Sequence, residues 1–285
     1  MESLAGLARQ LKSVSSLGHL VKTLKTLSAV NMRMFDRAAE AMEAYLTNIE
    51  SGLQVVLRTL PDHHLDLPAE GPPRLVMFGS DHGLCGAFHQ QLLHFVGKLE
   101  SVPSIICLGT RLADAAQDVE LKVDTVLSAP TSTAALAEVA GELLRLLQPM
   151  TGRVSLVYQR SHHGQHHPHQ ETLWPIETAW LNELRKRPWL TPGQPGGLPL
   201  CWDDPVAAFG WLLEEHIQVA CQRALAHSLA SENQARLATM QSAEKNLDEM
   251  RTSLRDRLQS HRQNAVTEEL LDVISGFEML KDLSA

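Results

Sequence analysis

The sequence predicts an α/β protein in which two long terminal helices pair as an antiparallel coiled coil, with one α/β domain between them. Three observations lead to this fold class. The end stretches, residues 1–60 and 206–285, lack proline and repeat apolar residues at helical spacing. Residues 61–187 alternate short apolar runs with helical patterns, and residues 188–205 are rich in proline and glycine. We therefore expect these four ranges to be helix, α/β domain, linker and helix.

The first helix is predicted from apolar residues at intervals of three or four, which is close to a heptad seam. These are Leu4, Leu7, Leu11, Val14, Leu17, Val21 and Leu24, followed by Met34, Ala38, Ala41, Tyr45, Ile49 and Leu53. Its first 33 residues are basic, with Arg9, Lys12, Lys22, Lys25 and Arg33 against Glu2 alone. This charge favours a local acidic partner, and a solvated helix face is the alternative.

The last helix is predicted from the pair Asp204 and Pro205, which are typical of an N-cap followed by the first helical position. One apolar stripe follows, formed by Leu247, Met250, Leu254, Leu258, His261 and Ala265. At 1.5 Å per residue, a continuous helix to the end of the chain would be about 115 Å long. No compact domain of this size buries such a helix, so we expect part of it to contact other chains.

The middle of the chain has the alternation of a small layered α/β structure. We expect buried strands at residues 75–78, 104–109 and 154–158, an edge strand at 172–176, and helices at 88–99, 110–117 and 134–148. This order predicts a Rossmann-like α/β domain.

The stretch GSDHGLCGAF at residues 79–88 joins the first strand to a helix. A glycine-rich loop in this place could cradle a phosphate group. The spacing matches neither GxxxxGK[ST] nor GxGxxG, and no lysine follows the last glycine. We interpret the loop as a tight turn whose glycines allow positive φ and close packing, and we expect no nucleotide cofactor.

Residues 161–170, SHHGQHHPHQ, contain His162, His163, His166, His167 and His169. Imidazoles at this density could hold zinc or nickel. No neighbouring cysteine or carboxylate pattern fixes a coordination geometry, so we favour an exposed histidine-rich hairpin loop and predict no metal site.

Composition excludes several functional classes. The 285 residues are 44% hydrophobic and 20% charged, with a net charge of −8, which disfavours bulk binding to nucleic acid. Cys85, Cys107, Cys201 and Cys221 form no CxxC pair, which indicates a reducing compartment, and we expect the first two in the core. No secretory signal and no apolar run of 18 residues occur, so we expect no direct membrane insertion. No catalytic triad or carboxylate pair stands out, and we predict no catalytic residue.

Three segments resemble the γ subunit of the F1 part of rotary ATP synthases. Residues 13–29 are similar to the family's S-V-x-N-T-x-x-I-T-K-A-M-K-M-V-A-A, and residues 79–88 to S-D-R-G-L-C-G-G-F. Residues 231–240 and 262–276 match S-E-x-x-A-R-M-x-A-M and R-Q-A-x-I-T-x-E-x-x-E-I-V-G-G-A. The chain departs from the family at Ser16, Leu17, Leu24 and His82 and in its histidine and proline segments, which points to a divergent branch such as the sodium-linked F-type ATPases.

The resemblance implies a non-catalytic rotor shaft that couples ion flow through the membrane to the conformational cycle of the β subunits. Its implied partners are the ring of three α and three β subunits, the ε subunit and the membrane c-ring. The implied location is peripheral, on the cytoplasmic face of the bacterial plasma membrane. The implied rotor contacts are Lys22, Leu24, Lys25, Arg33, Arg236, Arg262, Gln263 and Thr267. An unrelated coiled-coil adaptor and a nucleotide-binding α/β protein are the alternatives.

Overall fold

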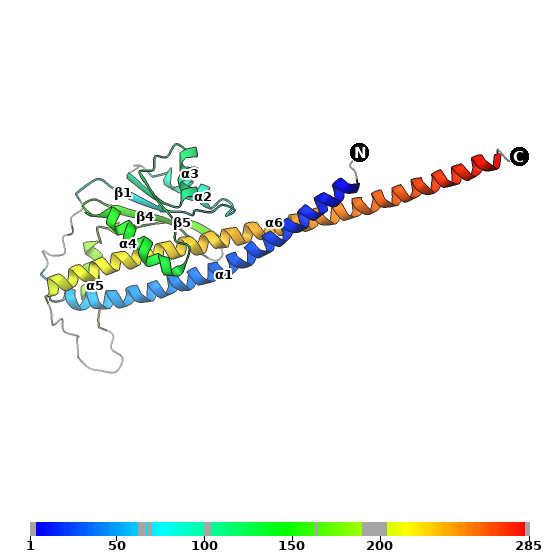
Figure 1. The fold of residues 1–285 in the computed structure, drawn as a ribbon. Helices are drawn as coiled ribbons and strands as arrows, with labels where there is room; N and C mark the ends of the chain where they lie inside the picture. Colours follow the sequence, from blue (N-terminus) through cyan, green and yellow to red (C-terminus); the bar gives the residue numbers. More distant parts are fainter. Residues whose placement is uncertain are drawn as a thin grey trace. The chain divides into compact units, whose positions relative to one another are not determined.

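The computed structural model describes residues 4–61, 67, 70–99, 104–162, 165–189 and 204–282. Residues 190–203, most of the predicted linker, lie outside the described residues. The chain divides into two compact units, one formed by Met1–Leu27 with Leu237–Ala285 and the other by Ser28–Arg236. Two long helices, α1 (Leu4–Leu57) and α6 (Pro205–Asp282), contribute to both units (Figure 1). We call them the coiled-coil unit and the α/β unit.

The α/β unit contains a five-stranded sheet in the order β3-β2-β1-β4-β5 (Figure 1). The strands are β1 (Arg74–Phe78), β2 (Ser104–Leu108), β3 (Thr125–Leu127), β4 (Val154–His162) and β5 (Gln165–Trp174). The first four are parallel, and β5 pairs antiparallel with β4 at one edge. The shorter helices are α2 (Phe88–Val96), α3 (Thr110–Asp118), α4 (Leu136–Leu147) and α5 (Thr178–Lys186), and Thr133–Ala135 form a 3-10 turn before α4. This is the α/β architecture that the sequence predicts.

Alternate residues of the strands fill two separate cores. Leu75, Met77 and Cys107 pack with the buried faces of α2 and α3. Val76 and Phe78 point to the other face of the sheet, where α1, α4 and α6 cover them. The strands are therefore buried on both sides, which explains why they read as continuous apolar runs in the sequence.

Helices α1 and α6 run antiparallel within the α/β unit. The hydroxyl group of Tyr45 lies 3.1 Å from a carboxylate oxygen of Glu215, and a Cβ on Gly52 would approach Leu212. The predicted seam is partly wrong here, since α1 buries Phe35, Ala39, Leu46, Ile49 and Leu53 and exposes Met34 and Tyr45. The buried face of α1 is rotated relative to the predicted seam because this helix packs against residues of the sheet as well as against α6.

The two helices also pair within the coiled-coil unit. Leu7, Val14 and Leu254 are buried together, and Leu11, Leu247 and Leu258 pack against them. This arrangement confirms the predicted pairing of the two terminal helices and places Val14 and Leu258 in the same apolar cluster. Leu17 and Met250 belong to the predicted stripes but are 50% and 52% exposed, because a seam between two helices is narrower than an i, i+3, i+4 series.

The histidine-rich segment is the main local correction. It was expected as an exposed loop, but β4 reaches His162 and β5 begins at Gln165, so His166, His167 and His169 lie in a strand. His163 lies outside the described residues. The pairs Ser161 with His166 and Tyr158 with His169 show that the long hairpin continues the sheet.

Candidate functional site on the terminal helices

In the coiled-coil unit, the basic start of α1 does not project uniformly into solvent. Lys22 is exposed and Leu24 is half-buried. The ammonium group of Lys25 forms an ion pair with Glu244 of α6. Two of the predicted contact residues are therefore half-buried, and Lys25 already has an acidic partner inside the chain.

Further along α6, Arg262, Gln263 and Thr267 are exposed, as expected for residues that contact another subunit. The Thr267 hydroxyl group donates a hydrogen bond to the Gln263 carbonyl group over 2.8 Å, and this bond holds that side chain against its own helix.

Large apolar side chains follow on the same part of α6. The apolar cluster shared with α1 ends at Leu258. Beyond it, the exposed residues are Val266, Leu270, Leu271, Val273 and Ile274. An exposed apolar surface rimmed by polar residues is typical of a protein–protein interface. The sequence analysis did not identify these residues as one exposed apolar surface, although their spacing along the helix can be read from the sequence.

In the α/β unit, Arg33 is exposed, whereas Arg236 is held inside the chain. Arg236 forms an ion pair with Glu232, and the Arg236 and Glu232 side chains are 13% and 4% exposed. Its Nε also donates to the carbonyl oxygen of Gly83 over 3.3 Å. Burial raises the pKa of Glu232 to about 7, opposed by the charge of Arg236. Arg236 thus ties α6 to the glycine-containing loop, residues 79–86.

The polar groups of this loop are used within the chain. Asp81 accepts hydrogen bonds from the backbone N–H groups of Thr110, at 2.8 Å, and Ala129, at 2.9 Å. Its carboxylate therefore occupies the N-terminus of α3, where an anionic ligand would otherwise bind. The Ser80 hydroxyl group donates to the carbonyl oxygen of His82 and lies 3.1 Å from Nε2 of His89.

Two glycines show why the loop needs this residue type. Gly86 has a φ of +59°, and a Cβ built on Gly79 would lie 2.4 Å from the Cβ of Leu112. Both observations support the interpretation of the loop as a structural turn. The absence of nucleotide binding stays a prediction.

The described residues contain neither a cluster of metal-ligating side chains nor a membrane-spanning helix. No group of three histidine, cysteine, aspartate or glutamate side chains in this part of the chain has a spacing suited to a metal ion. Among the helices that the structure describes, none has a stretch long and apolar enough to span a bilayer.

A protein-family model described as ATP synthase matches residues 3–280. The chain belongs to the ATP synthase gamma family. It is 29% identical to the ATP synthase gamma chain of Anaeromyxobacter sp., with 99% of this chain and all of that one covered. The ATP synthase gamma chain of Geotalea daltonii is 28% identical over the same shares of the two chains.

Two solved structures have a similar fold. A chain of the Euglena gracilis mitochondrial ATP synthase rotor matches with a TM-score of 0.65 and 16% identity, covering 92% of this chain and 98% of that one. A second Euglena gracilis structure, of the OSCP/F1/c-ring assembly, matches with a TM-score of 0.66 and 16% identity, covering 97% and 94%.

Membership in the family gives the role of the chain. It is the central rotor shaft of an ATP synthase and a non-catalytic subunit, since the catalytic sites lie on the β subunits. The expectation that the sequence drew from its three matching segments is confirmed at this level.

Proposed function

We propose that this chain turns inside a ring of three α and three β subunits and joins that ring to an ε subunit and a membrane c-ring. The observation that carries the proposal is the surface of α6 beyond Leu258, where apolar and polar side chains are exposed together. A rotor needs such a surface because its partners surround it. The similar Euglena gracilis chains belong to a rotor and to an OSCP/F1/c-ring assembly, which supports the same set of partners.

The proposed contacts to the ring fall into two groups. Lys22, Arg33, Arg262, Gln263 and Thr267 are exposed and available to acidic or polar groups of the ring. Leu24, Lys25 and Arg236 are half-buried, and the last two already pair with Glu244 and Glu232. We infer that the exposed residues contact the ring directly and that the half-buried residues stabilise the helices that carry them.

The mechanism follows from asymmetry. A shaft without threefold symmetry inside a ring of three catalytic β subunits contacts each β subunit differently at any moment. Each site is thereby biased toward a different conformation, and rotation passes these biases around the ring. ATP synthesis or hydrolysis in the ring is coupled in this way to ion flow through the membrane sector.

The cellular setting is part of the proposal. We place the complex on the cytoplasmic face of a bacterial plasma membrane, to which this chain attaches through its partners. The bacterial sources of the similar gamma chains support that location. The division into residues 1–60, 61–187, 188–205 and 206–285 remains our proposal for the functional parts.

Co-expression with the α and β subunits of the same organism tests the proposal. We expect an ATP-hydrolysing complex with three α, three β and one copy of this chain after affinity purification and size-exclusion chromatography. Purification of α and β without the chain, or of the chain alone, would count against the rotor assignment. An unrelated coiled-coil adaptor would give that second result.

A further inference from the structure

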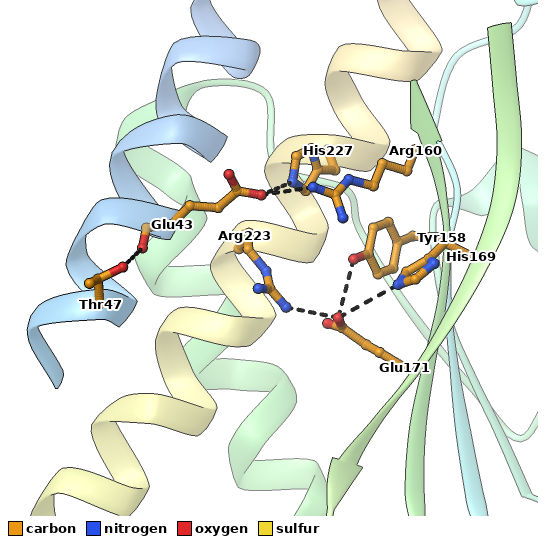
Figure 2. A network of polar contacts seen from close by, with 8 residues as sticks. All are labelled: Glu43, Thr47, Tyr158, Arg160, His169, Glu171, Arg223 and His227. Carbon is orange, nitrogen blue, oxygen red and sulfur yellow. Dashed lines mark hydrogen bonds and ion pairs between the residues drawn. The ribbon is translucent and has the colours of Figure 1, made fainter. Parts of the chain in front are cut away.

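Two arginines of α6 pair with carboxylates inside the α/β unit, and the two carboxylates differ in their surroundings. Nη2 of Arg223 donates to Oε2 of Glu171 over 2.8 Å, and the Tyr158 hydroxyl group donates to the same oxygen over 3.3 Å (Figure 2). Arg236 pairs with Glu232, which lies one turn earlier on α6. The Glu171 and Glu232 side chains are 21% and 4% exposed, so Glu232 is the more deeply buried acid.

The groups around Glu232 oppose its ionisation. The loop of residues 79–86 brings the carboxylate of Asp81 near it, and a second negative charge is unfavourable there. Burial and the charge of Asp81 raise the pKa of Glu232 to about 7, against the opposing charge of its arginine partner. Cys85 and His89 line the same cluster and are neutral near pH 7, because burial raises the pKa of the thiol and lowers the pKa of the imidazole to about 4. Among these described groups, Glu232 is therefore the one whose charge changes near neutral pH.

Arg236 connects this acid to a strained part of the loop. The guanidinium group pairs with Glu232, and its Nε donates to the carbonyl oxygen of Gly83 over 3.3 Å. The next residue, Leu84, has a φ of +64° and is 61% exposed. Leucine rarely adopts a positive φ, and such a conformation persists where neighbouring contacts impose it. The bond from Arg236 to the carbonyl group just before Leu84 is a contact of this kind.

We propose that Glu232 and Arg236 form a pH-sensitive switch that sets the conformation of Leu84. When Glu232 is ionised, its charge holds the guanidinium group beside the carbonyl oxygen of Gly83. When the carboxylate takes up a proton from solvent, the ion pair is lost and Arg236 is free to leave that oxygen. Leu84 then relaxes toward the negative φ values that leucine prefers. The paired state is therefore favoured above neutral pH and the released state below it.

The switch has a consequence for assembly that rests on the proposed function. Strained backbone is concentrated at sites that contact ligands or partners, and Leu84 presents a large apolar side chain to solvent. In a rotor, the position of this side chain toward a neighbouring subunit would follow the pH around the complex. The switch itself is a property of the chain, so its test needs no partner subunit and does not depend on the rotor assignment.

Methyl NMR of the leucine-labelled full-length chain tests the switch, with Leu84→Ala used to assign the Leu84 signals. The titration runs from about pH 5.5 to about pH 8.5, which spans the neutral range. We expect one transition of the Leu84 signals with a midpoint near pH 7. Glu232→Gln and Arg236→Gln should both abolish this transition. Each should hold the signals at the alkaline end close to the wild-type position at the acidic end.

Two controls separate the switch from other pH effects. Glu171→Gln removes the carboxylate that pairs with Arg223, the other buried arginine pair of α6, and should retain the transition. His82→Gln removes the exposed imidazole of the same loop and should also retain it. Absence of a transition in the wild type, its survival in Glu232→Gln or Arg236→Gln, or its loss in either control would each overturn the proposal. Circular dichroism melting curves at both ends of the pH range establish that each variant is folded.

Discussion

Ser80 connects two buried titratable residues whose pKa values differ from their usual ranges. His89 lies against its hydroxyl group, and burial lowers the pKa of His89 to about 4, assisted by the charges of Arg236 and Arg111. Glu232 also interacts with Ser80, and burial raises the pKa of Glu232 to about 7. The two residues therefore give opposite pH dependences to the stability of the fold.

The sign of each effect follows from proton linkage. The native pKa of His89 is below its unfolded value, so its stabilising contribution is lost as pH falls from about 6.5 toward 4. The native pKa of Glu232 is above its unfolded value, so its contribution is lost as pH rises from about 4.5 toward 7. The quantity to compare is the free energy of unfolding at pH 7 minus that at pH 5. His89→Gln should make this difference smaller, and Glu232→Gln should make it larger. Urea titrations at both pH values measure this difference, with His94→Gln on the exposed face of α2 as control.

The contact between Gly79 and Leu112 gives a second prediction. A methyl group at Gly79 would lie 2.4 Å from the Cβ of Leu112, inside the core that β1 shares with α3. Gly79→Ala should lower the free energy of unfolding by about 1–3 kcal/mol through overpacking. Gly83→Ala in the same loop is the control, since nothing lies within 4 Å of its Cβ position. Equal destabilisation of both variants in urea would contradict the packing argument.

The loop also shows what the sequence could predict at this scale. Its glycines and its failed phosphate-loop spacing already favoured a structural turn. The partners that fix the turn were beyond prediction, because Asp81 bonds to Ala129 and Arg236 to Gly83 across long separations in the sequence. Local patterns carry no information about which distant residue meets a given side chain.

At the scale of elements, the seam of the coiled-coil unit predicts local stability. Leu254 is 6% exposed and packs with Leu7 and Val14. Leu254→Ala should cost about 2–5 kcal/mol, as expected for a buried leucine. Hydrogen exchange should show faster opening of the amides near residues 7–14 and 247–258.

Leu270→Ala is the control, because Leu270 is 58% exposed on the same helix. It should leave hydrogen exchange in the isolated chain unchanged and weaken assembly with the α and β subunits. Equal effects of the two variants on the isolated chain would contradict the assignment of the seam.

The elements that the sequence predicted well are those with strong periodicity. The terminal helices and strands β1, β2 and β4 have long apolar patterns or fully apolar runs. Strand β3 was missed because it has only three residues. Helix α5 was also missed, although α2 and α3, which have the same length of nine residues, were predicted. The histidine hairpin was misjudged because polar residues form an edge strand when a neighbouring strand supplies the backbone hydrogen bonds.

At the scale of the whole molecule, the sequence predicted identity better than contacts. The matched segments pointed to the family, and the family match over residues 3–280 confirms this assignment. The resemblance also presented Lys25 and Arg236 as contacts to the ring, whereas the structure pairs both with carboxylates of the same chain. A carboxylate of the same chain that lies beside a basic residue competes with any external partner, and this pairing cannot be seen in the sequence.

The exposed pair Arg262 and Gln263 gives the last prediction, which concerns coupling. A charge-assisted hydrogen bond to the ring would contribute about 1.5–3 kcal/mol, so its loss could slow a coupled step about tenfold or more. Arg262→Ala combined with Gln263→Ala should leave the melting curve of the isolated chain unchanged, because both side chains are exposed. The assembled complex should show lower ATP turnover or lower ion pumping.

Arg255→Ala combined with Gln259→Ala is the control, since it removes the same two residue types from exposed positions of α6 near the seam with α1. We expect this control complex to turn over and pump like the wild type. A contact that forms at one rotor angle and breaks at the next affects coupling more than folding. The melting curve of the isolated chain therefore reports on folding, and the ATP turnover or ion pumping of the complex reports on coupling. If the Arg262 and Gln263 variant also pumps like the wild type, the ring contacts α6 through other residues, and the exposed apolar side chains from Val266 to Ile274 become the stronger candidates.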